Sequence, residues 1–263
     1  AERWLRASQK THPRTSSEAA RVFEQIRTNG KVRRGYLGIT LDSVKAEYAK
    51  IYGLNDQRGA IVLEIREPDG AAATAGIRSG DIIVEFDGRP VADAQDLIGK
   101  VASVSPDRTV DLTYLREAGT QMERKTVPVK LGLRELRAAR NDDTPRKLPI
   151  DPPDETAKPF GMTVIEITPE LANSLKLTDA KGLVVKEINP ESFIADVKLS
   201  TGVEALGQGD VIVRINRVPV TTAAAFYELA GKLKKGDPVV MHVLSPVPGP
   251  QRTVLKIVQF TVQ

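Results

Sequence analysis

Short runs of apolar and β-branched residues alternate along the chain with turn-forming Gly, Asp and Pro residues. In the first half these runs cover residues 59–65, 82–86 and 110–115, which suits β-strands in both length and composition. Helical spacing of apolar residues follows over residues 93–104, and again over about residues 222–233. The pattern predicts a mainly β fold with short helices (α+β), arranged as two small, partly open β-barrels.

A helix is also predicted ahead of the first strands. Thr15 and Glu18 have the spacing of a capping box, in which a hydroxyl and a carboxylate satisfy free amide groups at a helix start. Asn29 and Gly30 supply a stop signal, and the apolar residues at helical spacing between these two signals are Ala19, Val22, Phe23 and Ile26. This segment should be an amphipathic helix that leads into the first globular unit.

The two halves of the chain repeat one another. Gly80-Asp81-Ile82-Ile83-Val84 recurs as Gly209-Asp210-Val211-Ile212-Val213 at an offset of 129 residues, whereas the strand-like runs 59–65 and 182–188 are 123 residues apart. The second copy must therefore contain six additional residues, most simply around Ser200–Gly207. A duplicated unit with a surface insertion accounts for this pattern.

The composition changes between the two copies. Charged residues and prolines dominate from about residue 133 to residue 158 and apolar periodicity is lost, which indicates a semi-extended linker. The predicted organisation is a basic arm and connecting helix at 1–30, a first domain at 31–132, a linker at 133–158 and a second domain at 159–263. Each domain has an ordinary size of about one hundred residues.

Composition also narrows the possible functions. Of 263 residues, 41% are hydrophobic, 27% are charged and none is Cys, which excludes disulfides, thiolate chemistry and Cys-ligated metals. No apolar run reaches the length of about 18 residues that a membrane-spanning helix needs, and residues 1–6 lack the apolar core of a signal peptide. Residues 1–34 hold nine Lys or Arg against three Glu, a net charge of +6. Aromatic residues do not interleave with these charges, so we expect a solvated helix face and no nucleic-acid partner.

Candidate chemistry is sparse. His12 and His242 lie in different segments, and His242 falls in an apparent strand, where we expect a half-buried or surface position rather than a catalytic base. Asp81 and Asp210 each follow a glycine and precede a strand, so each carboxylate is expected to bond nearby backbone amides rather than a metal. We expect no catalytic residue, no metal site and no cofactor in this chain.

The most informative segment is Arg34-Gly35-Tyr36-Leu37-Gly38-Ile39-Thr40-Leu41. A glycine-containing turn that runs straight into a strand can aim successive backbone N–H groups outward, which makes an anion site without charged side chains. Alternate side chains of the strand, from Leu37, Ile39 and Leu41, share one face. The opposing wall would come from the 93–104 helix, through Ala94, Ile98 and Val101. Such a groove would accept a peptide as an added strand, with its terminal carboxylate docked on the loop.

These motifs resemble the start of the first PDZ domain of bacterial Do-like (HtrA/Deg) trypsin-like serine proteases. The resemblance rests on residues 34–39, 75–83 and 87–91, and on residues 20–26, which are similar to the helix that joins the family's protease domain to its first PDZ domain. It implies two PDZ-like modules in tandem, a periplasmic or cell-envelope location and a role in protein quality control, as the peptide-binding regulatory region of a serine protease. The family's protease domain, with its His/Asp/Ser triad, has no counterpart in this chain, which we therefore expect not to be an enzyme alone.

The resemblance also implies roles for individual residues. The amides of Leu37, Gly38 and Ile39 would hold a ligand carboxylate, Arg34 would support that carboxylate electrostatically, and Tyr36 belongs to the same loop. The second copy departs from this pattern, because its loop has no preceding arginine and carries Pro159 where a freely turning residue is wanted. A second peptide pocket would be lined by Phe160, Gly161, Met162 and Val164, opposite Ala223, Tyr227 and Ala230.

Two functions are therefore open. The leading one is a tandem that binds unfolded or C-terminally exposed polypeptides, with its own protease domain as a further partner. The alternative is a structural or assembly module whose grooves are occupied by segments of the same chain. A 37–41 edge that is already paired within the fold would favour this alternative.

Overall fold

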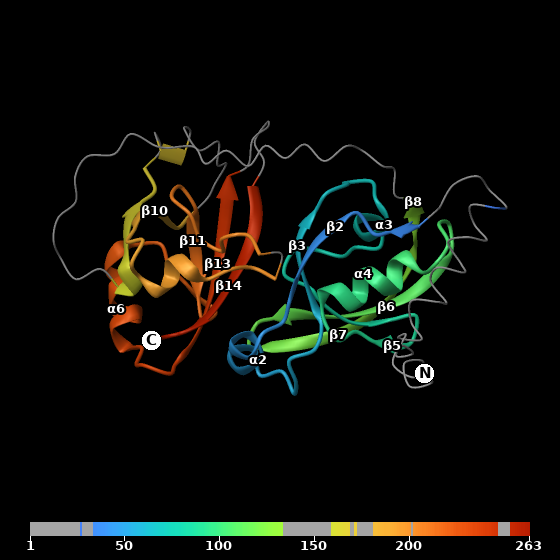
Figure 1. Ribbon diagram of the computed structural model, residues 1–263, viewed down its shortest axis with the longest axis horizontal. Helices are drawn as coiled ribbons and strands as arrows, with labels where there is room; N and C mark the ends of the chain where they lie inside the picture. Colours follow the sequence, from blue (N-terminus) through green and yellow to red (C-terminus); the bar gives the residue numbers. More distant parts are fainter. Residues whose placement is uncertain are drawn as a thin grey trace, which may run out of the picture.

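Two antiparallel sheets, one in each half of the chain, form the framework of the protein (Figure 1). The computed structural model describes residues 27, 34–133, 159–168, 171–172, 181–200, 202–246 and 253–263. The expected N-terminal helix, apart from Arg27, and the expected linker, apart from Leu133, lie outside the described residues. The predicted mainly β fold with short helices is confirmed, and both sheets are open rather than closed into barrels.

The first sheet has the strand order β2-β3-β4-β6-β7, with β5 beside β4. Its strands are β2 (Ile39–Ser43), β3 (Ala60–Ile65), β4 (Ile82–Phe86), β5 (Arg89–Pro90), β6 (Thr109–Ala118) and β7 (Gln121–Lys130). A separate pair joins β1 (Gly35–Tyr36) to β8 (Gly132–Leu133). The helices of this half are α2 (Ala46–Tyr52), α3 (Ala71–Thr74) and α4 (Ala94–Ala102).

The second sheet repeats this plan in the order β9-β10-β11-β13-β14, with β12 beside β11. Its strands are β9 (Met162–Glu166), β10 (Leu183–Ile188), β11 (Val211–Ile215), β12 (Val218–Pro219), β13 (Pro238–Pro246) and β14 (Thr253–Thr261). Its helical segments are η1 (Pro159–Gly161), η2 (Phe193–Asp196) and α6 (Ala223–Lys232). Strand β9 therefore occupies the same edge position as β2, and α6 corresponds to α4.

Both long helices begin where the sequence places a capping side chain. The Asp93 carboxylate accepts a hydrogen bond of 2.8 Å from the amide of Asp96, at the start of α4. The Thr222 hydroxyl accepts one of 3.2 Å from the amide of Ala225, at the start of α6. These bonds satisfy amides that the first helical turn leaves without a partner, so the helix starts are fixed locally.

The two halves pack directly on each other. Helix α2 lies at the boundary between the sheets (Figure 1), and its side chains Tyr48, Ala49 and Tyr52 pack in one buried cluster with Val240 of β13 and Ile257 of β14. Tyr48 and Tyr52 are stacked, with ring centroids 4.1 Å apart and planes 8° from parallel. Burial of this much apolar and aromatic surface fixes the second half against α2 and the strand β2 that precedes it.

Candidate functional site

Strand β2 is an edge strand with backbone groups directed away from the sheet. Its one neighbour among the described strands is β3, and Ile39 pairs with Ile65 in that ladder. The amide of Arg66 donates to the carbonyl of Gly38 at 2.8 Å. This bond flanks the Ile39–Ile65 pair, so the N–H and C=O of Ile39 point away from β3, toward the open edge. After a register shift, Leu41 pairs with Val62 and has the same orientation, because the amide of Val44 donates to the carbonyl of Gly59.

The loop before β2 aims two amides in the same direction. The Leu37 carbonyl accepts from the amide of Ala72 at 3.1 Å, and the Gly38 carbonyl accepts from Arg66. In a trans peptide the N–H is antiparallel to the C=O, so the amides of Gly38 and Ile39 face away from these donors. Gly38 has a φ of +75°, a conformation that disfavours any side chain. The loop thus presents adjacent N–H donors at the closed end of the β2 edge, the arrangement that binds a carboxylate.

The apolar side chains that were expected to line a groove lie beside the β2 edge, and Leu97 joins them. Ile39 and Leu41 are partly buried against the first core cluster, to which Ala94 and Val101 of α4 belong. Ile98 is 46% exposed, so this large apolar side chain lies at the surface of α4. Leu97 is fully buried in the same cluster and was not anticipated, because the apolar residues of this helix allow spacings of three or four.

The other expected residues of the first loop take different positions. Leu37 is buried in the core cluster and therefore supports the loop from below. Tyr36 is half-buried in β1, where it pairs with Gly132, and Arg34 is exposed immediately before that strand. Sequence reasoning missed Glu67, whose Oε2 atom would lie 3.3 Å from a Cβ atom added to Gly38. This places a negative charge beside the proposed anion site.

The second copy retains the turn before its edge strand, but the side chains of that strand are more deeply buried than those of β2. Phe160 and Gly161 both have positive φ angles, and the Gly161 carbonyl accepts from the amide of Asn189 at 2.8 Å, as Gly38 does from Arg66. Met162 is fully buried and Val164 nearly so, whereas Ile39 and Leu41 at the matching positions are partly exposed.

Aromatic packing closes the same region. The Phe160 ring lies edge-on to Phe193, Phe226 and Phe260, with centroids 6.4, 6.3 and 5.4 Å apart. Ala230 is buried, and Ala223 and Tyr227 are partly buried against the second core cluster. The side chains predicted to line a second pocket therefore pack largely on one another.

The paired aspartates behave as the sequence predicts. The Asp81 carboxylate accepts from the amide of Arg78 at 2.8 Å, and that of Asp210 accepts from the amide of Gly207 at 2.9 Å. Each also has a cationic partner from another strand of its own sheet, Arg116 of β6 at 2.7 Å for Asp81 and Lys256 of β14 at 3.3 Å for Asp210. Within the described ranges, no group of three or more His, Cys, Asp or Glu side chains is placed to hold a metal ion, and no helix could span a membrane.

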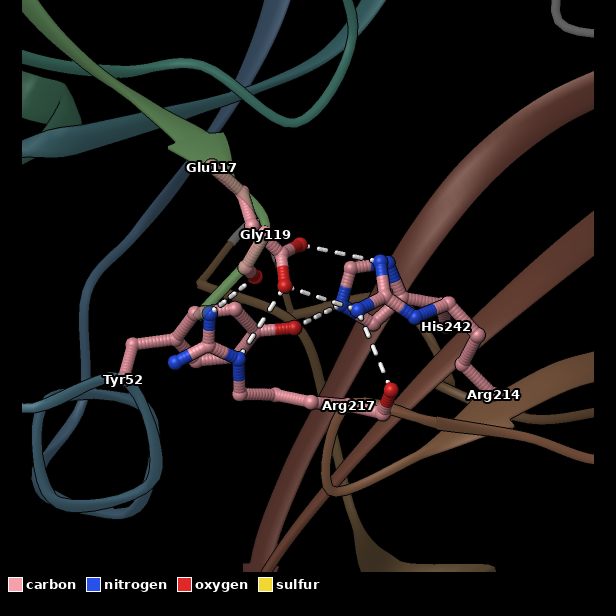
Figure 2. A network of polar contacts seen from close by, with 6 residues as sticks. All are labelled: Tyr52, Glu117, Gly119, Arg214, Arg217 and His242. Carbon is pink, nitrogen blue, oxygen red and sulfur yellow. Dashed lines mark hydrogen bonds and ion pairs between the residues drawn. The ribbon is translucent and has the colours of Figure 1, made fainter. Parts of the chain in front are cut away.

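The position expected for His242 is wrong. Its side chain is buried, at 7% exposure, and its Nε2 atom lies 2.7 Å from the Tyr52 hydroxyl of the first half (Figure 2). Burial and the nearby charge of Arg214 lower the pKa of His242 to about 4, and burial raises the pKa of Tyr52 to about 12. Both groups are therefore neutral over the physiological range, and the lowered pKa makes His242 a weak base.

An ion-pair network surrounds this contact. Glu117 of β6 accepts from Nη1 and Nη2 of Arg214, both at 2.9 Å, and from Nε of Arg217 at 3.0 Å (Figure 2). Arg217 also donates to the Gly119 carbonyl at 2.8 Å. These contacts join the two halves of the chain. Both arginines donate to the single carboxylate of Glu117, so the three side chains together carry a net charge of +1.

Comparison with known proteins agrees with this geometry. A family model described as PDZ domain matches residues 35–131. The probable periplasmic serine endoprotease DegP-like of Pseudomonas fulva is 32% identical over 233 residues, which cover 87% of this chain and 44% of that protein. Its namesakes in Ectopseudomonas mendocina (30% over 233 residues, 86% and 44%) and Brucella suis (31% over 208 residues, 79% and 36%) are similarly related. The chain thus spans less than half the length of these relatives.

Two solved structures are similar in sequence over less than half of this chain. The HtrA-type protease AlgW with a decapeptide is 28% identical, with a TM-score of 0.39, over 46% of this chain and 35% of that chain. The serine endoprotease from Yersinia pestis is also 28% identical, with a TM-score of 0.35, over 46% and 36%. The PDZ domain model thus matches residues 35–131, and the chain is similar over 233 residues to DegP-like serine endoproteases.

Proposed function

We propose that the first module, residues 35–131, binds the C-terminal ends of other polypeptides. The observation that carries this proposal is the open edge of β2, which ends at the outward amides of Gly38 and Ile39 and is flanked by apolar side chains. A guest strand would pair with Ile39 and Leu41, and its terminal carboxylate would accept from the loop amides. Its last apolar side chain would pack between β2 and α4.

The names of the relatives suggest the setting. They are described as periplasmic serine endoproteases. We propose that this chain works in the periplasm as the substrate-recognition and regulatory region of such a protease, where exposed chain ends mark unfolded proteins. On this proposal the first module binds the substrate, and the peptide-bond chemistry belongs to a protease domain.

Calorimetric titration with matched peptides tests the proposal. An eight-residue peptide with an apolar free-acid C-terminus should bind with a micromolar Kd, because added-strand interfaces of this size are small. The same peptide with an amidated C-terminus should bind at least tenfold more weakly, since the loop amides lose their anionic partner. Equal affinities for the acid and the amide would refute carboxylate capture.

A matched pair of variants locates the site. Ile98→Glu places a charge on the groove side of α4 and should abolish binding of the free-acid peptide. Tyr227 occupies the equivalent position on α6, so Tyr227→Glu is the control and should leave the affinity unchanged. Loss of binding only in the Tyr227→Glu protein would transfer the site to the second module.

A second function, docking, is favoured for the second module. Met162 and Val164 are buried, and Phe160 is held in an aromatic cluster, so the cleft between β9 and α6 is filled by the module's own side chains. Val240 and Ile257 of the same module pack against α2 of the first. We therefore assign to the second module a packing role rather than an equal share in peptide binding.

A further inference from the structure

Among the described residues, the open edge of β2 has no backbone partner at Ile39 and Leu41 but is occupied at its other end. The Gln259 side chain of β14 donates from Nε2 to the Ser43 carbonyl at 3.1 Å and accepts at Oε1 from the Lys45 amide at 2.9 Å. Gln259 is 3% exposed, so this carboxamide is enclosed between the two modules. Gln259 belongs to the second module, whereas Ser43 and Lys45 belong to the first.

The two hydrogen bonds of Gln259 resemble those that a neighbouring strand would make. Because the amide of Val44 donates to Gly59 on β3, the Ser43 carbonyl points to the same open edge as the backbone groups of Ile39 and Leu41. A carboxamide carries N–H donors and a carbonyl acceptor, so it can form the same two bonds as a backbone peptide group. The Gln259 side chain therefore occupies the place that the backbone of a guest strand would take beyond Leu41.

Further bonds hold this end of β2 in place. The Asp42 carboxylate, which is buried, accepts from the amide of Ser200 at 2.9 Å, and the Lys45 ammonium donates to the Lys198 carbonyl at 3.0 Å. Ser200 begins the segment in which the sequence predicts the insertion of the second copy. The residues around this insertion thus contact the first module and hold the second against the end of its peptide-binding edge.

We infer that the second module is an end stop for the peptide groove, which limits the guest to a short C-terminal tail. This inference rests on the proposed function of the first module. Antiparallel guest residues pair at every second position. With the last residue opposite Ile39, the third from the end lies opposite Leu41 and the fifth would meet Ser43, where Gln259 is bound. The groove therefore takes about four residues in extended form, and the preceding chain must leave the sheet.

Backbone N-methylation of a bound peptide tests this inference. The probe is an eight-residue peptide with an apolar free-acid C-terminus, methylated at one amide at a time, and the readout is Kd by calorimetry. Methylation of the third residue from the end should weaken binding at least tenfold, because it removes the donor to the Leu41 carbonyl. Methylation of the fifth should change Kd less than twofold.

The Gln259→Ala variant provides a second test of this inference. It frees the Ser43 carbonyl, so methylation of the fifth residue should now weaken binding at least fivefold. Gln208→Ala, at an exposed site in the same module, is the control and should behave as the unaltered protein does. If the Gln259→Ala protein binds the peptide well but methylation of the fifth residue still does not weaken binding, Gln259 does not close the groove.

The outcomes separate this inference from the proposed function. If the unmethylated free-acid peptide does not bind, or binds no better than its amide, the proposed function fails. If it binds and the unaltered protein is weakened alike by methylation at the third and fifth residues, the groove is longer than we infer and the end stop is wrong. This second result needs no variant, so it stands even if Gln259→Ala does not fold.

Discussion

Replacement of Glu117 by glutamine should loosen the contact between the two modules. Glu117 accepts three hydrogen bonds from Arg214 and Arg217, with N–O distances of 2.9, 2.9 and 3.0 Å. Burial acts to raise the pKa of this carboxyl, but the hydrogen bonds and positive charges of Arg214 and Arg217 outweigh it, and the net pKa is lowered. The ionised form is therefore the one that the folded protein stabilises, and glutamine removes its charge.

The magnitude follows from the exposure of the three side chains. Glu117 is 23% exposed, Arg214 27% and Arg217 20%, so the network lies between a surface pair and a buried one. Surface pairs contribute about 0–1 kcal/mol, and loss of one partner of a buried pair costs about 3–5 kcal/mol. Glutamine retains one acceptor oxygen, so we expect a loss of about 2 kcal/mol. For a protein of this size that corresponds to a fall in Tm of roughly 4–8 °C.

Scanning calorimetry and urea unfolding measure this loss. Glu123→Gln is the matched control, because Glu123 is a carboxylate at the start of β7 whose ion pair with Lys125 is half-exposed. Its replacement should not change Tm measurably, since solvent screens such a pair. If Glu117→Gln and Glu123→Gln shift Tm by the same amount, the network does not couple the modules and the reasoning is wrong.

Two further predictions concern the pH dependence of stability and the affinity for peptides. His242 has a pKa of about 4, below the ordinary value of 6.5, so the folded state favours its neutral form; stability should be complete above pH 6.5 and fall by about 3 kcal/mol toward pH 4. Urea unfolding at several pH values, compared with His242→Asn, isolates this effect, and equal pH profiles for the two proteins would contradict it. Glu67 lies beside Gly38, so Glu67→Gln should bind free-acid peptides several-fold more tightly at low salt, and with a smaller gain at high salt, because like charges repel. An unchanged Kd at low salt would show that this carboxylate does not face the ligand.

The local features of the fold were predictable from the sequence because their causes are local. The capping side chains Asp93 and Thr222 lie within three residues of the amides that they satisfy. The aspartates of the Gly-Asp repeat bond amides three residues earlier, at Arg78 and Gly207. Such contacts depend on short spacings and on side-chain type, which a single sequence contains.

The contact between the modules was not predictable because it joins residues that are distant in the chain. The Tyr52–His242 bond spans 190 residues, and the Lys45–Gln259 bond spans 214. Nothing near residue 242 indicates that its strand faces a second domain, so His242 was expected at a half-buried or surface position. Helix α2 was also missed, because it is only seven residues long and its apolar side chains pack partly against the other module.

The candidate site was predictable in outline. Alternation along the strand placed Ile39 and Leu41 on one side, and the structure packs both against the first core. Which backbone groups face the open edge depends on the ladder register, which the sequence does not specify. The boundary of the groove at Gln259 depends on the second module, so it required the structure.

The stacked pair of Tyr48 and Tyr52 provides a spectroscopic signal for the boundary between the two modules. Two of the five tyrosines in the chain lie there with nearly parallel rings 4.1 Å apart, and Trp4 is the only tryptophan. Closely stacked phenol chromophores couple and give a circular dichroism band in the near ultraviolet. Because Val240 and Ile257 of the second module pack in the same cluster as these rings, that band should change when the modules separate while the far-ultraviolet signal of each sheet persists, so separation can be followed without any added label.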